Sequence, residues 1–220
     1  MNNSSGFTEG TLVHTKRGLV PIQDIRIGDE VLSVDVSQGN ERVYKRVEKT
    51  FNSIQDIFRC TMLYPKGNQQ HTIHYFFSSQ NQRVRSASGE WFAVNEIDDS
   101  MIDVYTLTDK NLCLWWNKMI YQSKNKSGQT FAISTNTFTD DYHLSGNDEY
   151  IDISSEGLIH HKVDDEDFNF SPETEKFLQS SVDWNIFESE ILRLSVYQLI
   201  IQDTGNYLVG SEGILVHDGS

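Results

Sequence analysis

Short runs in which apolar and polar residues alternate cover much of the chain, and turn-forming residues separate these runs. Alternation with period two is typical of strands that bury one face, and β-branched and aromatic residues strengthen that interpretation. The pattern predicts strands over residues 11–15, 30–36, 42–51, 54–63, 72–77, 104–107 and 112–121. The chain is therefore expected to be built mainly of β-strands.

Two turn signals punctuate the first of these runs. Lys16-Arg17-Gly18 and Gly28-Asp29 each place a glycine where the chain must reverse, because glycine adopts positive φ without a steric penalty. Pro21 lacks a backbone donor and fits only an edge or the start of a strand.

One region has a different composition. The segment 140–190 is acidic and contains two apolar patches, and a helix is expected over residues 171–184. Ser171 would cap its N-terminus and Pro172 would occupy the first helical position, followed by acidic residues in the first turn.

The charge of the chain limits its partners. Its 220 residues carry 18 Lys and Arg against 32 Asp and Glu, giving a formal net charge of −14. Such a surface repels phosphate backbones, so no nucleic-acid partner is expected. No run of about 18 apolar residues predicts a membrane span, and residues 1–5 do not resemble a signal peptide. The location in the cell stays open. Cys60 and Cys113 are expected to be small core residues rather than a disulfide framework.

The segment from Gly6 to Asp35, GFTEGTLVHTKRGLVPIQDIRIGDEVLSVD, carries a recognisable pattern. It resembles the opening block of the Hint superfamily, which comprises inteins, bacterial intein-like domains and Hedgehog autoprocessing domains. That block begins with a nucleophile, usually Cys, followed by an aromatic or apolar residue, two variable positions and Gly-Thr. This chain matches the pattern except at its first position, where Gly6 stands in place of the nucleophile.

A second segment, Ser79 to Ile97, resembles the middle Hint block. The tail of that block, Gly-x-Trp followed by an apolar residue and Glu, is present. In the catalytic Thr-x-x-His pair, however, Ser79 takes the Thr position and Gln82 takes the His position. A second alignment would use His71 and His74 instead, and it ranks lower because it leaves the Gly-x-Trp spacing too long.

The last segment, 193–220, resembles the C-terminal Hint block most strongly. Its matching positions include Gly213-Ile214-Leu215-Val216-His217. Three positions depart from the family pattern. Gly205 replaces a His in the turn, Asp218 replaces the terminal Asn, and Gly219 replaces the nucleophile that follows it.

The resemblance implies an all-β Hint horseshoe of two pseudo-symmetric, intertwined halves whose ends meet at one cleft. It divides the chain into a flanking segment 1–5, a Hint domain over 6–121 and 191–218, an acidic, partly helical insertion over 122–190, and a flanking segment 219–220. The implied activity is self-cleavage or self-splicing that acts in cis on flanking polypeptide segments. The residues at the catalytic positions are Gly6, Ser79, Gln82, Gly205, His217, Asp218 and Gly219.

These residues argue against efficient chemistry. Gly6 cannot form a thioester or an ester, and Gln82 has no proton that titrates near neutral pH. The Asp218 carboxylate is a poorer nucleophile than an amide for the ring closure that cuts the chain. An Asp-Gly pair can still form a cyclic imide, which isomerises the chain without cutting it. The sequence therefore predicts an impaired or inactive processing domain.

Two other functions are kept as alternatives. The first is a non-catalytic interaction or spacer module that meets a basic protein partner through the acidic insertion or the cleft. The second is a metal site at His160, His161, Asp164 and Asp165, which a solvated polar loop explains better. No cofactor, metal or membrane partner is expected.

Overall fold

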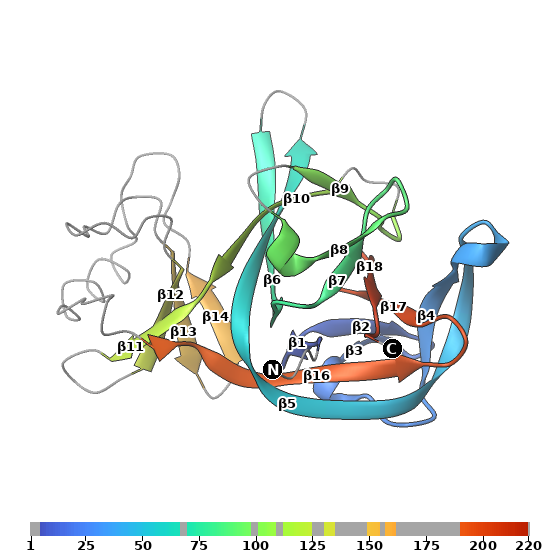
Figure 1. Cartoon of the computed structure of the whole chain (residues 1–220), viewed down its shortest axis with the longest axis horizontal. Coiled ribbons are helices and arrows are strands. Elements are labelled where there is room, and N and C mark those ends of the chain that lie inside the picture. Colours follow the sequence, from blue (N-terminus) through green and yellow to red (C-terminus); the bar gives the residue numbers. More distant parts are fainter. Residues whose placement is uncertain are drawn as a thin grey trace. The chain divides into compact units, whose positions relative to one another are not determined.

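The computed structural model describes residues 5–66, 70–97, 101–108, 112–124, 130–134, 149–154, 157–161 and 190–219. Its helical elements in these ranges are three-residue 3-10 turns, and every other regular element is a strand (Figure 1). The chain divides into two compact units, one formed by Met1–Asn117 with Arg193–Ser220 and the other by Lys118–Leu192.

The first unit contains most of the strands. They are β1 (Phe7–Thr8), β2 (Leu12–Thr15), β3 (Gly18–Pro21), β4 (Glu30–Asp35), β5 (Glu41–Lys66), β6 (Gln70–Ser79), β7 (Arg83–Arg85), β8 (Trp91–Ala93), β9 (Ile102–Val104), β10 (Leu112–Met119), β16 (Arg193–Ile201), β17 (Asn206–Val209) and β18 (Ile214–His217). The 3-10 turns are η1 (Ile22–Asp24), η2 (Val36–Gln38) and η3 (Val94–Glu96).

The 26-residue strand β5 connects the parts of this unit, because it pairs with β4, β16 and β6 in succession and also with β10. Its first part is antiparallel to β4, its middle part to β16, and its last part to β6. In Figure 1, β5 runs along one side of the unit beside β16 and then turns toward β6. One long strand therefore brings the N-terminal, middle and C-terminal segments together.

The short first strand, β1, lies between β16 and β6 in the sheet. Phe7 in β1 lies opposite Tyr197 in β16 and opposite Ser78 in β6, so β1 fills the space between those strands. Phe7 is fully buried, and its ring lies 5.8 Å from the ring of Phe76, centroid to centroid. This burial holds the residue after Gly6 in place.

The C-terminal hairpin of β17 and β18 lies between the N-terminal and middle segments. β17 pairs with β2, and β18 pairs with β7, which continues to β8. Leu208 and Leu215 face each other across this hairpin and are both fully buried. At about 25 cal/mol per Å² of apolar surface, such side chains contribute roughly 1.5–3 kcal/mol each to folding.

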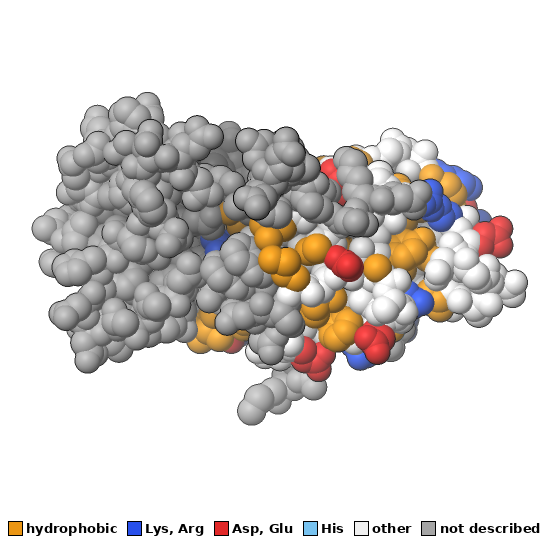
Figure 2. Space-filling view, turned by 90° about the horizontal axis from the view of Figure 1, so that it is seen from above, with side chains coloured by type: hydrophobic (Ala, Val, Ile, Leu, Met, Phe, Trp, Pro, Cys, Tyr) orange, Lys and Arg blue, Asp and Glu red, His pale blue; other side chains and the backbone are white. Residues whose placement is uncertain are grey.

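The surface of the described part is mixed rather than uniformly polar. Figure 2 shows hydrophobic side chains lying between polar and charged ones on one face. The large exposed hydrophobic side chains are Leu19, Ile27, Val36, Tyr44, Phe51, Ile54 and Met101. No helix in the described ranges is long and apolar enough to cross a lipid bilayer.

The second unit has its own antiparallel sheet. Its strands follow the order β14 (Gly157–His161), β13 (Glu149–Ser154), β12 (Thr130–Ser134), β11 (Tyr121–Lys124) and β15 (Glu190–Ile191). The predicted helix over 171–184 and the side chains of the His160-His161 cluster lie outside the described residues.

The prediction of an all-β fold is confirmed, while several predicted strand boundaries are wrong. The strand expected over 104–107 is β9, which ends at Val104, and the strand expected over 112–121 is divided at Ile120 into β10 and β11. A third difference concerns β5. The sequence placed a break between 42–51 and 54–63, where the polar residues Asn52 and Ser53 interrupt the apolar run. The structure has one continuous strand there, because Asn52 and Ser53 pair with Tyr197 and Val196 of β16. Antiparallel pairing with β16, rather than burial of the side chains, keeps these residues in the strand.

Candidate functional site

Gly6 lies where the N-terminal segment enters the fold, and its carbonyl oxygen accepts a hydrogen bond from the backbone N–H of Ser79 at 3.0 Å. Its φ is +153°, a value that residues with a side chain rarely adopt. A Cβ added there would lie 2.8 Å from the carbonyl oxygen of Tyr197. The backbone at this position is therefore specific for glycine, and any side-chain nucleophile would require the chain to shift.

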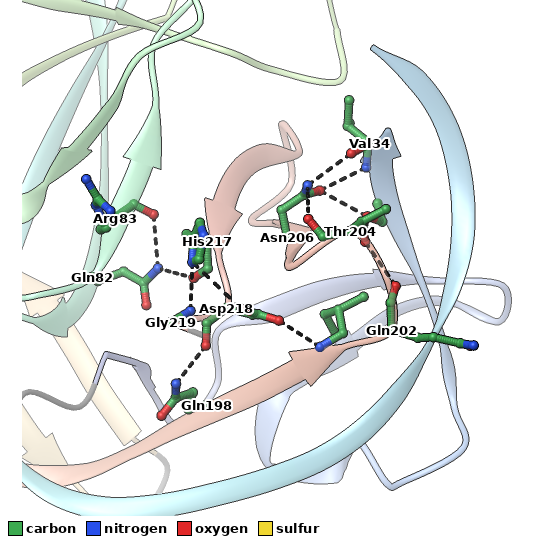
Figure 3. A network of polar contacts seen from close by, with 12 residues as sticks. Val34, Gln82, Arg83, Gln198, Gln202, Thr204, Asn206, His217, Asp218 and Gly219 are labelled. Carbon is green, nitrogen blue, oxygen red and sulfur yellow. Dashed lines mark hydrogen bonds and ion pairs between the residues drawn. The ribbon is translucent and has the colours of Figure 1, made fainter. Parts of the chain in front are cut away.

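Ser79 is the last residue of β6, Gln82 lies in the turn before β7, and both are almost fully buried. The side-chain amide of Gln82 donates hydrogen bonds to the carbonyl oxygens of Arg83 and His217, each at 3.0 Å (Figure 3). Among the residues that the structure describes, the Ser79 hydroxyl has no hydrogen-bond partner. The structure thus places Ser79 next to Gly6, and Gln82 next to His217. The alternative pair, His71 and His74, lies earlier in β6, where their backbones are opposite Pro65 and Met62.

His217 ends β18 and faces the last peptide of the domain. Its Nδ1 accepts a hydrogen bond from the Gly219 N–H at 2.9 Å and lies 3.7 Å from Oδ1 of Asp218 (Figure 3). The ring meets Trp91 edge to face, with the centroids 5.2 Å apart. Burial lowers the pKa of His217; the Asp218 carboxylate opposes this change, and Arg83 lowers the pKa further. The imidazole is therefore held in its neutral form at neutral pH.

Asp218 is fully buried and is held at three atoms. Its N–H donates to the Gly205 carbonyl at 2.9 Å, and its Oδ2 accepts from the Ile201 N–H at 2.8 Å. Its main-chain carbonyl oxygen accepts from Nε2 of Gln198 at 2.7 Å (Figure 3). The carboxylate therefore has a defined orientation, and Gly205 contributes to the site through its backbone rather than a side chain.

The two ends of the domain meet at this site, as the sequence predicted. A Cβ added to Gly219, whose φ is +81°, would collide with the side chains of Ser5 and Gln198. Ser5 is buried, and its hydroxyl has no hydrogen-bond partner within the described part of the chain. The segment entering the fold and the segment leaving it are thus in contact through Ser5 and Gly219.

Sequence reasoning missed two residues that organise the site, Gln198 and Asn206. The Asn206 side chain accepts from the Val34 N–H at 2.9 Å and donates to the Val34 carbonyl at 3.0 Å, which ties β17 to β4. Each is a polar residue placed at or within an apolar strand, VYQLII for Gln198 and NYLV for Asn206. A buried amide is stable only when its hydrogen bonds are made, so that placement was a usable signal.

The cysteines offer no substitute for the missing nucleophile. Cys60 is fully buried, and burial raises the pKa of its thiol well above the ordinary value. Burial and the neighbouring Asp103 carboxylate raise the pKa of Cys113 to about 11. In the described ranges no group of three His, Cys, Asp or Glu residues could hold a metal ion.

Comparison with known proteins gives the fold but no close relative. No family model matches the chain, and no curated protein matches it. Among solved structures, it is similar to a DnaB intein from Synechocystis sp. PCC 6803, with a TM-score of 0.50 and 10% identity over 99% of this chain and 100% of that chain. It is also similar to a bacterial intein-like domain from Clostridium thermocellum, with a TM-score of 0.47 and 14% identity over 96% and 97% of the two chains.

The strand order and the meeting ends define an all-β domain whose first and last described segments lie in contact. More specifically, the chain has the Hint fold, the fold of intein and intein-like domains.

Proposed function

We propose that this chain is an intein-like autoprocessing domain that has lost its processing chemistry, or retains it only in impaired form. It would act on polypeptide segments that flank it in cis. The observation that carries the proposal is Gly6, which stands at the nucleophile position without a side chain and beside a carbonyl oxygen that leaves no room for one. Without that nucleophile, the acyl shift at the first junction cannot begin.

Two further predicted catalytic positions support the same conclusion. At the middle position Gln82 uses its amide to bind backbone carbonyl oxygens, a structural role that needs no proton transfer. General acid–base catalysis by a His there would contribute roughly 10²–10⁴ in rate. At the last position Asp218 offers a carboxylate that Ile201 holds by a hydrogen bond. Several members of one catalytic unit are thus replaced, and such losses do not leave the remaining groups fully effective.

We further propose that residues 6–121 and 191–218 form the Hint domain and that residues 122–190 are an insertion. The division of the chain into two compact units, with the second spanning Lys118–Leu192, supports this boundary. All seven residues at the predicted catalytic positions belong to the first unit.

The experiment expresses the chain between two folded reporter domains and follows the products by intact-mass spectrometry. We expect a single uncut product after prolonged incubation, both with and without added thiol. The same reporters released by a protease provide the mass standards. Free reporter or joined reporters would contradict the proposal, and the junction that is cut would identify the group that remains active.

The alternative function is a non-catalytic interaction or spacer module that binds a basic partner. The net charge of −14 favours it, as does a site whose buried polar groups are bound to the backbone. The probe is a lysine-rich peptide, with binding measured at about 0.15 M and about 0.5 M salt. Binding that persists at the higher salt supports specific contacts, since screening weakens loose charge attraction. Binding lost at the higher salt contradicts this alternative.

A further inference from the structure

The peptide between Asp218 and Gly219 makes contacts that the lost processing chemistry does not explain. The Gly219 N–H donates to Nδ1 of His217 at 2.9 Å, and that nitrogen lies 3.7 Å from Oδ1 of Asp218. The second carboxyl oxygen of Asp218 accepts from the Ile201 N–H at 2.8 Å. One imidazole nitrogen therefore faces both an amide N–H and an oxygen of the carboxyl group beside it (Figure 3).

We propose that the folded protein condenses the Asp218 side chain with the Gly219 backbone nitrogen into a five-membered cyclic imide, with His217 carrying the proton. The chain is not cut, and hydrolysis of the imide leaves either the normal peptide or an isoaspartyl link. This reaction needs no flanking segment and no nucleophile at Gly6. It can therefore succeed or fail independently of the proposed loss of processing.

The step consumes one proton from the solvent and otherwise balances within the site. That proton binds Oδ1 of the Asp218 carboxylate and converts it to the carboxylic acid. Nδ1 of His217 takes the proton of the Gly219 N–H, and the nitrogen electron pair attacks Cγ of the Asp218 carboxylic acid. The negative charge that develops on Oδ2 is stabilised by the Ile201 N–H. The imidazolium then returns its proton to the hydroxyl at Oδ1, the bond from Cγ to Oδ1 breaks, and that oxygen leaves as water. A new bond joins Gly219 N to Asp218 Cγ, one solvent proton and one oxygen of the carboxylate leave as part of water, and no oxidant or reductant is needed.

The surroundings favour this direction of attack. Burial keeps the pKa of His217 below its usual value, so the imidazole is a free base that can accept the proton. Gly219 carries no side chain that would hinder its nitrogen. The Asp218 side chain is fully buried and is fixed by Ile201 next to that nitrogen. A general base placed at hydrogen-bond distance contributes roughly 10²–10⁴ in rate.

The same contacts disfavour cleavage at this peptide. Attack of the Asp218 carboxylate on its own main-chain carbonyl would expel the Gly219 nitrogen, which must gain a proton to leave. The neutral His217 accepts the Gly219 N–H and has no proton on Nδ1 to give. Gln198 donates to the main-chain carbonyl oxygen, yet that donor alone does not protonate the leaving nitrogen. Imide formation is therefore the outcome that this geometry supports.

The test incubates the protein in water enriched in ¹⁸O and measures oxygen incorporation at residue 218 by peptide mass spectrometry. Each cycle of imide formation and hydrolysis introduces one heavy oxygen. The exposed Asp203, which pairs with Lys45, provides the background within the same chain. Incorporation is compared between the folded protein, the denatured protein, and the folded variants His217→Gln and His14→Gln. His14 serves as the matched control because its Nε2 contacts the Gly210 carbonyl rather than the last peptide.

We expect incorporation at residue 218 at least tenfold faster in the folded protein than in the denatured chain, within the range that a general base supplies. His217→Gln should lose this acceleration, and His14→Gln should keep it. Incorporation that is no faster in the folded state overturns the proposal. The proposal is also overturned if a folded His217→Gln variant incorporates oxygen at residue 218 as fast as the parent. A new amino terminus at Gly219, which would show cleavage instead of imide formation, overturns it as well. If His217→Gln does not fold, the comparison of folded with denatured protein decides.

Discussion

Gln82 and His217 are 135 residues apart in the chain, and the side-chain amide of the first donates to the backbone carbonyl of the second at 3.0 Å. Gln82 thus serves as a structural bridge between the middle and C-terminal segments. The resemblance to the Hint pattern would place a catalytic His at this position, whereas the Gln82 amide here binds backbone carbonyl oxygens.

Substituting Gln82 by Ala should destabilise the protein by about 1–3 kcal/mol, because the His217 carbonyl would lose a buried donor. Chemical denaturation measures the free energy of unfolding. Gln38 is exposed and is the matched control, and Gln38→Ala should stay within about 0.5 kcal/mol of the parent. Equal losses for both variants would contradict the bridging role.

Introducing a side chain at Gly6 should lower the free energy of unfolding more than introducing one at Gly10. Both glycines have positive φ, but a Cβ at Gly10 meets nothing within 4 Å, whereas a Cβ at Gly6 meets the Tyr197 carbonyl at 2.8 Å. Gly10→Ala should cost the left-handed backbone penalty of about 1–2 kcal/mol. Gly6→Ala should cost roughly 1–3 kcal/mol more through overpacking.

The measurement is again the free energy of unfolding, with the two variants compared at one temperature. A Gly6→Ala variant as stable as Gly10→Ala would show that β16 can move aside. In that case Gly6→Cys becomes a feasible route to restoring the first step. If the two differ as expected, Gly6→Cys alone should not yield cleavage at the first junction.

Asn206→Asp should destabilise the hairpin although the side chain keeps its shape. A carboxylate can accept from the Val34 N–H but cannot donate to the Val34 carbonyl, so a buried acceptor is left unpaired beside a buried charge. At neutral pH, the lost hydrogen bond to the Val34 carbonyl should lower the free energy of unfolding by about 1–3 kcal/mol or more. Stability unchanged in Asn206→Asp would rule out the Asn206 amide as the tie between β17 and β4.

His217 should make the protein less stable as the medium becomes acidic. Its folded-state pKa lies below the unfolded value of about 6.5 because of burial, with the Asp218 carboxylate opposing the shift and Arg83 adding to it. The unfolded chain therefore binds a proton first, and stability falls as pH decreases through about 6.5 until the folded-state His217 also titrates. Urea unfolding at a series of pH values should reveal this slope, and His217→Gln should remove that contribution. An unchanged slope in the variant would mean that another group causes it.

The two thiols should react slowly with an alkylating reagent in the folded state. The pKa of Cys113 is about 11, so at pH 8 its thiolate fraction is roughly a hundredfold or more below that of a free cysteine. Cys60 is fully buried and should react only after unfolding. Mass spectrometry of the labelled peptides in native and denaturing buffer distinguishes the two sites. Rapid labelling of Cys60 in native buffer would contradict the described core.

Much of the fold could be read from local pattern. Alternating apolar residues and glycine turns predicted the strands, and three separated motifs predicted the Hint fold and the positions that the site would occupy. The absence of a nucleophile at Gly6 was also fixed by the sequence, since no fold can supply a side chain that glycine lacks. These conclusions hold because strand periodicity and turn chemistry are local properties of the chain.

The tertiary structure decided how the remaining groups are used. The continuity of β5 through Asn52 and Ser53, the bridge from Gln82 to His217, and the amide of Asn206 on Val34 all join residues far apart in the chain. A hydrogen bond between distant segments depends on which strands become neighbours, and the local sequence does not encode that choice. For this reason the sequence could name Asp218 and Gly219, while only the fold could place the Asp218 carboxylate on the Ile201 N–H and its main-chain carbonyl oxygen on Gln198.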